Sequence, residues 1–125
     1  MKADITIMSG DGVGPEITRE AVKALQAIGS VFDHDFSLNE VLFGGIAIDE
    51  TGTPYPEKTQ QACKNSDAVL LGAVGGPKWS DPNMKIRPEN EGLLAMRADL
   101  GIYANIRPIK TYPALIDNSP VKNRY

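Results

Sequence analysis

"ADITIMSGDGVGPEITREAVKALQAIGS", residues 3–30, passes from a strand pattern to a helix pattern through a cluster of glycines. Residues 3–10 alternate apolar and polar side chains and then reach glycine, which predicts a short buried strand. Pro15 stands at the expected first helical position, and Glu16 lies in the first turn, where the helix dipole favours negative charge. Gly29 is placed where a helix stop belongs. The helical stripe between them consists of Ile17, Ala21, Val22, Ala24, Leu25 and Ile28.

The same alternation of strand and helix continues along the chain. The apolar run at 68–76 is bounded by glycines and is typical of a strand covered on both faces. This rhythm predicts the α/β class, with a mostly parallel sheet flanked by helices. The segments expected after residue 30 are a strand at 36–44, a loop and a short helix from Pro56 within 53–67, a strand at 68–76, a loop at 76–91, a helix at 92–100 closed by Gly101, and a strand at 102–110.

Composition excludes several classes of function. The chain is 42% hydrophobic and 23% charged, as in globular proteins, and its net charge of −3 leaves no positive face for nucleic acid. The amino terminus lacks the apolar run of a signal peptide, and no stretch is long enough to span a membrane. We therefore expect a cytoplasmic protein without nucleic-acid or membrane partners. The single cysteine, Cys63, lies in a helical pattern and is expected to be a buried, inert thiol.

Two glycine-rich loops are candidate ligand sites. "SGDGVGPE" at 9–16 joins the first strand to the first helix, a common place for phosphate binding. Pro15 breaks the dinucleotide fingerprint, and no Gly-Lys-Ser/Thr follows, so a tight turn and another kind of ligand loop both stay open. "GAVGGPKW" at 72–79 ends a predicted strand, where open α/β sheets bind ligands. It is either a turn or a ligand loop, and Trp79 could equally pack on the domain.

"LLAMRADLGIYANIRP", residues 93–108, combines two leucines with two arginines. Leu93, Leu94 and Arg97 are spaced to share one face of a helix. Two converging guanidinium groups repel each other unless an anion lies between them, and their planar forks suit carboxylates. The segment is either surface arginine beside core leucine or a pocket for a ligand with an alkyl group and carboxylates. Alternation in the predicted strand sends Tyr103, Asn105 and Arg107 to one side, and Ile102, Ala104 and Ile106 toward the core.

Six motifs in order resemble the isocitrate/isopropylmalate β-decarboxylating dehydrogenase family, and within it the isopropylmalate branch. The resemblance implies the first part of an isopropylmalate-dehydrogenase-like fold, which is not a Rossmann dinucleotide fold. It also implies that residues 1–125 are the N-terminal part of such an enzyme, its first α/β domain, with the remainder absent from this chain. The motifs are GDGVGPE at 10–16, FGGIAIDETGTPYPEKT at 43–59, SDAVLLGAVGGPKW at 66–79, RPE at 87–89, GLLAMR at 92–97 and ANIRP at 104–108.

The resemblance assigns a substrate site to the leucine–arginine segment. It implies that Arg97 and Arg107 clasp the carboxylates of a malate-type substrate, and that Leu93 and Leu94 contact its alkyl group. Leucines are unsuited to a third carboxylate, which would lose its hydration there without replacement. The implied reaction is the oxidative decarboxylation of 3-isopropylmalate with NAD, in leucine biosynthesis, assisted by Mg²⁺ or Mn²⁺.

The resemblance also implies a nicotinamide cofactor site. "RPENEGLL" at 87–94 holds one more residue before Gly92 than the family's usual pattern, so either Glu89 or Glu91 fills the acidic position near the nicotinamide. The positions carried over as cofactor-binding are Gly75, Gly76, Pro77, Lys78, Trp79, Arg87, Glu89 and Val13.

The family's remaining machinery is expected beyond residue 125. It comprises the catalytic tyrosine and lysine, a third substrate arginine, the metal-binding aspartates and the adenosine loop, so we expect no catalytic or metal-binding residue in this chain and no turnover by it alone. The full-length protein is expected to be a homodimer by analogy. The alternatives are a sister enzyme acting on tartrate, malate, homoisocitrate or isocitrate, and a non-catalytic dicarboxylate-binding module.

Overall fold

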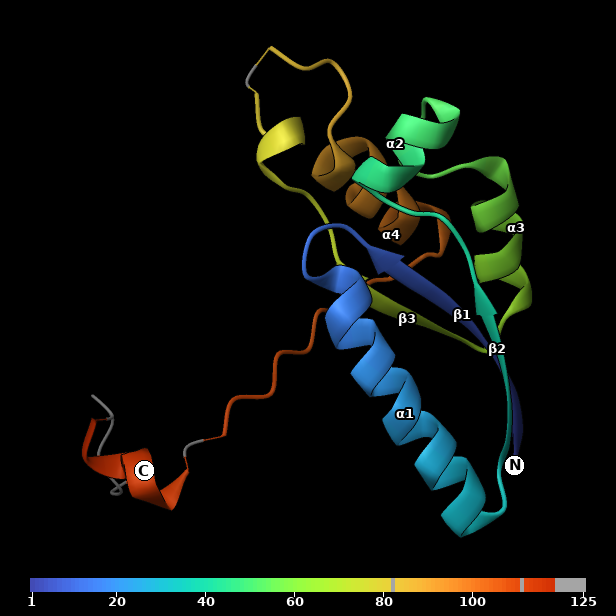
Figure 1. The fold of residues 1–125 in the computed structure, drawn as a ribbon, viewed down its shortest axis with the longest axis vertical. Helices are drawn as coiled ribbons and strands as arrows, with labels where there is room; N and C mark the ends of the chain where they lie inside the picture. Colours follow the sequence, from blue (N-terminus) through green and yellow to red (C-terminus); the bar gives the residue numbers. More distant parts are fainter. Residues whose placement is uncertain (82, 111, 119–125) are drawn as a thin grey trace.

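The computed structural model describes residues 1–81, 83–110 and 112–118. The opening stretch forms the predicted strand and helix, β1 (Lys2–Gly10) and α1 (Gly14–Phe32), as Figure 1 shows. The predicted stop at Gly29 is wrong, because α1 continues to Phe32 and ends at Asp33 in the left-handed conformation, with φ of 54°. The Gly29 carbonyl instead accepts a 2.8 Å hydrogen bond from the His34 N–H, which caps the last turn.

Within the described residues, β1 is the central strand of a three-stranded parallel sheet with the order β2-β1-β3. Its neighbours are β2 (Asp35–Glu40) and β3 (Ala68–Ala73), and Ile5 of β1 pairs with Leu38 on one side and Ala68 on the other. The α/β class and the parallel pairing predicted from the sequence are confirmed. Because the strands run in the same direction, the loops that follow them meet at one edge, called here the carboxyl edge.

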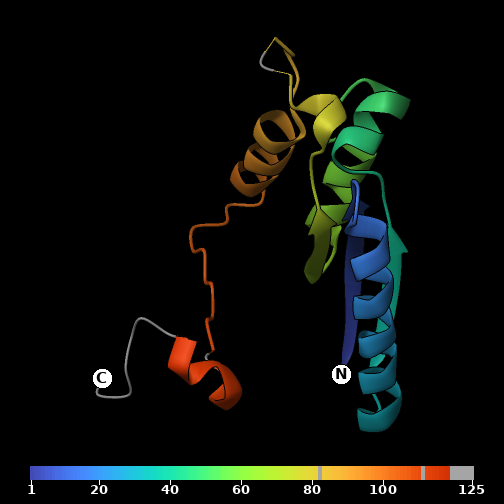
Figure 2. The ribbon, with the colours of Figure 1, turned by 60° about the vertical axis from the view of Figure 1, so that its left-hand side comes forward.

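Helices cover both faces of the sheet (Figures 1 and 2). α1 packs on one face, and α3 (Glu57–Asn65) lies with α4 (Ala95–Asp99) on the other. β3 is less enclosed than predicted, since its apolar side chains are half-buried at an edge of the sheet. The core on the α3 and α4 face is a cluster of buried side chains: Met8, Phe43, Tyr55, Cys63 and Met96.

The predicted burial of Cys63 is confirmed, because its residue is only 4% exposed and packs within this core. Burial raises the pKa of its thiol, which disfavours the reactive thiolate.

The helices after β2 agree only partly with the sequence pattern. α3 confirms the predicted short helix, with Pro56 immediately before its first residue. The predicted strand at 36–44 is too long, because β2 ends at Glu40. The glycines at 44 and 45 instead lie at the start of α2 (Gly45–Thr51), which the sequence pattern does not predict. The predicted loop at 76–91 contains one 3₁₀ turn, η1 (Pro77–Trp79). The predicted 92–100 helix begins earlier, as a π-helical segment, η2 (Pro88–Leu94), that continues into α4.

The predicted strand at 102–110 is wrong. These residues are irregular, and Figures 1 and 2 show them leading away from the sheet to a short 3₁₀ helix, η3 (Pro113–Asn118). Ile102 and Ile106, predicted to face the core, are 51% and 85% exposed, and Ala104 is exposed as well. An alternating pattern becomes a strand only where another backbone supplies hydrogen bonds, and no described strand pairs with this segment.

No helix in the described ranges combines the length and the apolar character that crossing a bilayer requires.

Candidate functional site at the carboxyl edge

Asp11, in the first glycine loop, binds two other segments through its carboxylate. Its Oδ2 accepts hydrogen bonds from the N–H groups of Gly45, at 2.7 Å, and Gly75, at 2.8 Å. Its Oδ1 accepts one from the N–H of Ile46, at 2.8 Å. Asp11 is only 4% exposed. Sequence analysis missed this residue because its partners are backbone groups far along the chain; an acidic residue among glycines at a strand end was the available signal.

The loop at 75–79 packs against α2. The Trp79 ring lies so close to Gly45 that a Cβ at this glycine would overlap it, and the Trp79 residue is half-buried. Lys78 forms an ion pair with Asp49 of α2, with 2.6 Å between Nζ and Oδ2, and its Nζ lies 5.3 Å from the centre of the Trp79 ring. Trp79 therefore packs on the domain with part of its surface still accessible, and Lys78 already has an acidic partner. Contact of either residue with a cofactor stays a prediction.

The structure distinguishes Glu89 from Glu91. The Glu89 carboxylate reaches the loop after β3, where a Cβ at Gly75 would overlap its Oε1. Gly75 also has a φ of 94°, which favours glycine. Glu91 faces the start of its own helical segment, where Oε2 accepts a 2.6 Å hydrogen bond from the N–H of Arg87. Glu89 is thus the acidic side chain at the carboxyl edge, and Glu91 caps η2.

Most of "RPENEGLL" forms η2, the π-helical segment. π-helical turns are rare and occur mostly as single turns within α-helices, frequently at functional sites. Gly92 packs on Pro54 and Phe43, which places this segment against the core. That the segment holds one more residue than the family's usual pattern stays a prediction.

The other predicted cofactor residues flank this edge. Val13, the residue that precedes α1, is 54% exposed. Pro77 is exposed, Gly76 is half-buried before η1, and the half-buried Arg87 donates from Nη2 to the Asp81 carbonyl at 3.4 Å. The structure therefore brings the 75–79 loop and Glu89 together and places Val13 in the neighbouring loop.

The two leucines of the predicted substrate site have different environments. Leu93 is half-buried and packs against the core cluster, whereas Leu94 is 55% exposed. Met96, on the buried side of α4, is only 4% exposed. Leu94 is therefore the more accessible of the two leucines, and Leu93 also supports the position of the segment. Contact of the two leucines with a substrate stays a prediction.

α4 is held in place by polar contacts with α3 and with the loop that precedes α3. The Tyr55 O–H donates to Asp99 Oδ2 at 3.1 Å, and Lys64 Nζ lies 2.6 Å from Asp99 Oδ1. The hydrogen bond from Lys64 lowers the pKa of the Asp99 carboxyl below its ordinary value. Burial, followed by the hydrogen bond to Asp99, raises the pKa of Tyr55 above its ordinary value. These contacts set the position of Arg97, which lies on the same short helix.

Arg97 lines a groove of about 330 Å³ together with the segment that follows α4. Arg107 is absent from this lining, and its Nε donates to Asn105 Oδ1 at 3.4 Å. Neither arginine forms an ion pair with an acidic side chain in the described part of the chain. The convergence of the two guanidinium groups stays a prediction. The other lining residues are Ile102, Tyr103, Ala104, Asn105 and Ile106.

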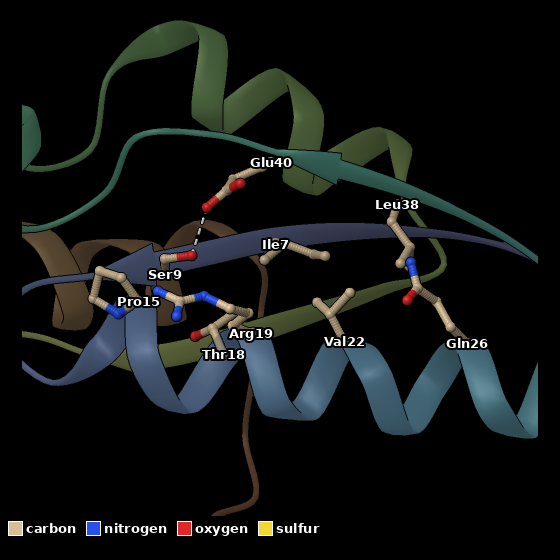
Figure 3. Close-up of a pocket in the computed structure, with 9 residues that line it drawn as sticks. All are labelled: Ile7, Ser9, Pro15, Thr18, Arg19, Val22, Gln26, Leu38 and Glu40. Carbon is tan, nitrogen blue, oxygen red and sulfur yellow. Dashed lines mark hydrogen bonds between the residues drawn. The ribbon is translucent and has the colours of Figure 1, made fainter.

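A second groove, of about 460 Å³, lies between α1 and the strands β1 and β2 (Figure 3). The Ser9 hydroxyl donates to Glu40 Oε1 at 2.6 Å across it. None of the residues predicted from the sequence to bind substrate or cofactor lines this groove. It is lined by Ile7, Ser9, Pro15, Thr18, Arg19, Val22, Gln26, Leu38 and Glu40.

No three His, Cys, Asp or Glu side chains gather as metal ligands within residues 1–81, 83–110 and 112–118. These residues therefore do not fit a complete divalent-metal site by themselves.

Comparison with known proteins identifies the family to which this chain belongs. The family model described as isocitrate/isopropylmalate dehydrogenase matches residues 4–125. A crystal structure of the apo form of a β-decarboxylating dehydrogenase from Thermococcus kodakarensis is similar, with a TM-score of 0.64 and 29% identity over 80% of this chain and 27% of that one. The chain belongs to the isocitrate/isopropylmalate dehydrogenase family.

Individual relatives in this family are similar over nearly all of this chain. The 3-isopropylmalate dehydrogenase of Priestia megaterium is 53% identical over 125 residues, which are 100% of this chain and 34% of the relative. Those of Salinibacter ruber and Bacillus subtilis are 54% and 48% identical, over 95% and 100% of this chain and 32% and 34% of their own lengths. The chain thus spans about one third of the length of the relatives it matches.

Proposed function

We propose that this chain is the N-terminal part of an NAD-dependent 3-isopropylmalate dehydrogenase, which oxidises and decarboxylates its substrate in leucine biosynthesis. The observation that carries the proposal is the identity of 48–54% over at least 95% of this chain to proteins of that name. The family model alone supports only the broader class of decarboxylating dehydrogenases.

In this proposal the exposed Leu94 contacts the alkyl group of the substrate and excludes water from it. Arg97 and Arg107 hold the carboxylates, since both are free of acidic partners among the described residues. Isocitrate would place a third carboxylate against the leucine, where it would lose hydration without a replacement.

The cofactor site in this proposal is the surface formed by the 75–79 loop, Val13, Arg87 and Glu89. The Glu89 carboxylate is exposed and without an ion-pair partner in the described ranges, so it can accept a hydrogen bond from an amide such as the nicotinamide carboxamide. NAD supplies hydride acceptance when it is bound. The proposal assigns no ligand of Mg²⁺ or Mn²⁺ to the described residues, among which no three His, Cys, Asp or Glu side chains gather.

A chimera tests the proposal directly. The corresponding third of the Priestia megaterium enzyme is replaced by this chain, and NADH formation is followed by absorbance with 3-isopropylmalate, isocitrate, malate and tartrate in turn. We expect turnover with 3-isopropylmalate and at least a hundredfold lower kcat/KM with isocitrate. A folded chimera that prefers another substrate contradicts the proposal.

Two controls accompany the chimera. Arg97→Gln and Arg107→Gln should each lower kcat/KM, because a neutral amide replaces one charged contact to a carboxylate. The 125-residue chain alone, mixed with NAD, Mg²⁺ and 3-isopropylmalate, is expected to form no NADH.

A further inference from the structure

We propose that Asp11 is a positioning residue that fixes the 75–79 loop against α2, so that the cofactor surface is formed before the cofactor binds. The cofactor part of this inference rests on the proposed function. The positioning part rests only on the structure.

The geometry places one carboxylate where three segments meet. Asp11 belongs to the loop after β1, Gly75 to the loop after β3, and Gly45 and Ile46 are the first two residues of α2. The Asp11 backbone N–H also donates to the Ala73 carbonyl at 2.7 Å, so the backbone and the side chain of Asp11 both bind the end of β3. A displacement of Asp11 would therefore release the loop and the helix together.

Asp11 is the acceptor for all three N–H donors. The N–H groups of the first turn of a helix lack partners within the helix, and the residue before α2 is Gly44, which has no side chain to cap it. A carboxylate satisfies such donors better than a neutral oxygen, because the hydrogen bonds are charge-assisted. The carboxylate also packs closely on the residue before α2, since a Cβ at Gly44 would lie 2.6 Å from Asp11 Oδ2.

The segments that Asp11 binds carry or contact residues of the proposed cofactor site. Trp79 packs on Gly45, Lys78 pairs with Asp49 of α2, and Glu89 lies against Gly75. The Trp79 and Lys78 contacts depend on the distance between α2 and the loop, and the Glu89 contact depends on the position of Gly75. Asp11 accepts hydrogen bonds from α2 and from Gly75. Asp11 itself is buried and acts through its neighbours, which distinguishes positioning from contact with a ligand.

Amide hydrogen exchange measured by NMR on the unmodified 125-residue chain is the first test. The amides of Gly45, Ile46 and Gly75 should be protected, although the Ile46 residue is 39% exposed. Exchange of these three amides at the rate of a free peptide overturns the proposal, without any variant having to fold.

Asp11→Asn is the second test, because asparagine keeps the size of the side chain and replaces one acceptor oxygen by a donor. We expect exchange at the three amides to accelerate at least tenfold while the amides of Ile7 and Met8 in β1 keep their rates. The emission of Trp79, the single tryptophan of the chain, should shift to longer wavelength as its ring leaves Gly45. Unchanged exchange, or equal acceleration across the sheet, overturns the proposal.

Asp67→Asn is the matched control. Asp67 Oδ2 also accepts a backbone hydrogen bond, from the Asp4 N–H at 2.9 Å, but at the opposite edge of the sheet. This variant should leave the exchange of the Gly45, Ile46 and Gly75 amides and the Trp79 emission unchanged. If it loosens the loop as much as Asp11→Asn does, the effect of Asp11 is general stability, and the proposal is wrong.

The chimera tests the cofactor part separately. Asp11→Asn in the chimera should raise KM for NAD at least tenfold and change kcat less than threefold, whereas a general loss of folded enzyme would lower the apparent kcat at unchanged KM. An unchanged KM for NAD overturns the cofactor part. If the unmodified chimera shows no dehydrogenase activity, the proposed function fails, while hydrogen exchange still decides whether Asp11 positions the loop.

Discussion

Lys64 of α3 and Asp99 of α4 form an ion pair, with 2.6 Å between Nζ and Oδ1, and the Tyr55 hydroxyl donates to the other carboxylate oxygen. This contact joins two helices on the same face of the sheet. Because Arg97 lies on the same short helix as Asp99, the pair connects the packing of the domain to the proposed substrate site.

The pH dependence of stability should reveal this pair. The pKa of Asp99 in the folded chain lies below its ordinary value of 3.8, so its contribution is fully present above pH 3.8 and is lost as the pH falls through the folded pKa. Asp99→Asn should lower the urea midpoint at pH 7, and the difference from the unmodified chain should shrink below pH 3.8. The midpoints are measured by circular dichroism.

Glu20→Gln provides the comparison for that experiment. Glu20 and Lys23 also form an ion pair, at 2.7 Å, but their side chains are 65% and 62% exposed and both lie on α1. Exposed pairs of this kind contribute little. A shift of the midpoint as large as that of Asp99→Asn would contradict a special role for the pair between α3 and α4.

The two leucines of the proposed substrate site should differ in their effects on stability. Leu93→Ala should lower the free energy of unfolding by about 1–3 kcal/mol, because it opens a space beside the core cluster. Leu94→Ala should change it by less than about 0.5 kcal/mol, since Leu94 is 55% exposed. Urea unfolding measures both, and equal losses would contradict the division of roles.

Leu94 should also affect the kinetics of the chimera. Leu94→Ala should raise KM for 3-isopropylmalate with little effect on KM for malate, which has no alkyl branch to lose contact. A parallel rise for both substrates would place Leu94 outside the substrate site.

Shortening η2 by one residue should uncouple Glu89 from Gly75. Deletion of Asn90 should convert the π-helical segment to α-helical spacing, in which each residue turns by about 100°, and move the Glu89 carboxylate away from the loop. Gly75→Ala should then cost about 1 kcal/mol less in the deletion variant than in the parent, a coupling typical of residues in contact. Additive effects in this double-mutant cycle would show that Glu89 does not approach Gly75.

Cys63 should resist thiol reagents until the chain unfolds. Its residue is 4% exposed, and burial raises the pKa of its thiol, so the thiolate is scarce. A chromogenic disulfide reagent at pH 8 should react slowly in buffer and quickly in concentrated urea. Ala24→Cys, at an exposed position of α1, adds a second thiol that should react quickly in buffer; two slow thiols, or two fast ones, would contradict the prediction.

Local sequence predicted those elements whose causes are local. The strand–glycine–helix pattern of residues 3–30 and the apolar run after residue 67 gave β1, α1 and the existence of β3, because periodicity and capping act over a few neighbouring residues. The local pattern did not predict α2, because its first N–H groups are capped by Asp11, more than thirty positions earlier in the chain. The failure at 102–110 has a related cause: alternation describes a strand, but pairing needs a partner.

The sequence by itself determined the α/β class, the mostly parallel pairing, the two glycine loops and the resemblance to the dehydrogenase family, because these follow from short periodicities and ordered motifs. Only the tertiary structure decided that Glu89 rather than Glu91 reaches the carboxyl edge, that Leu94 rather than Leu93 is exposed, and that Asp11 binds two distant segments. The direction of a side chain and the partner of a carboxylate depend on how segments far apart in the sequence pack together. No pattern within a few neighbouring residues encodes that packing.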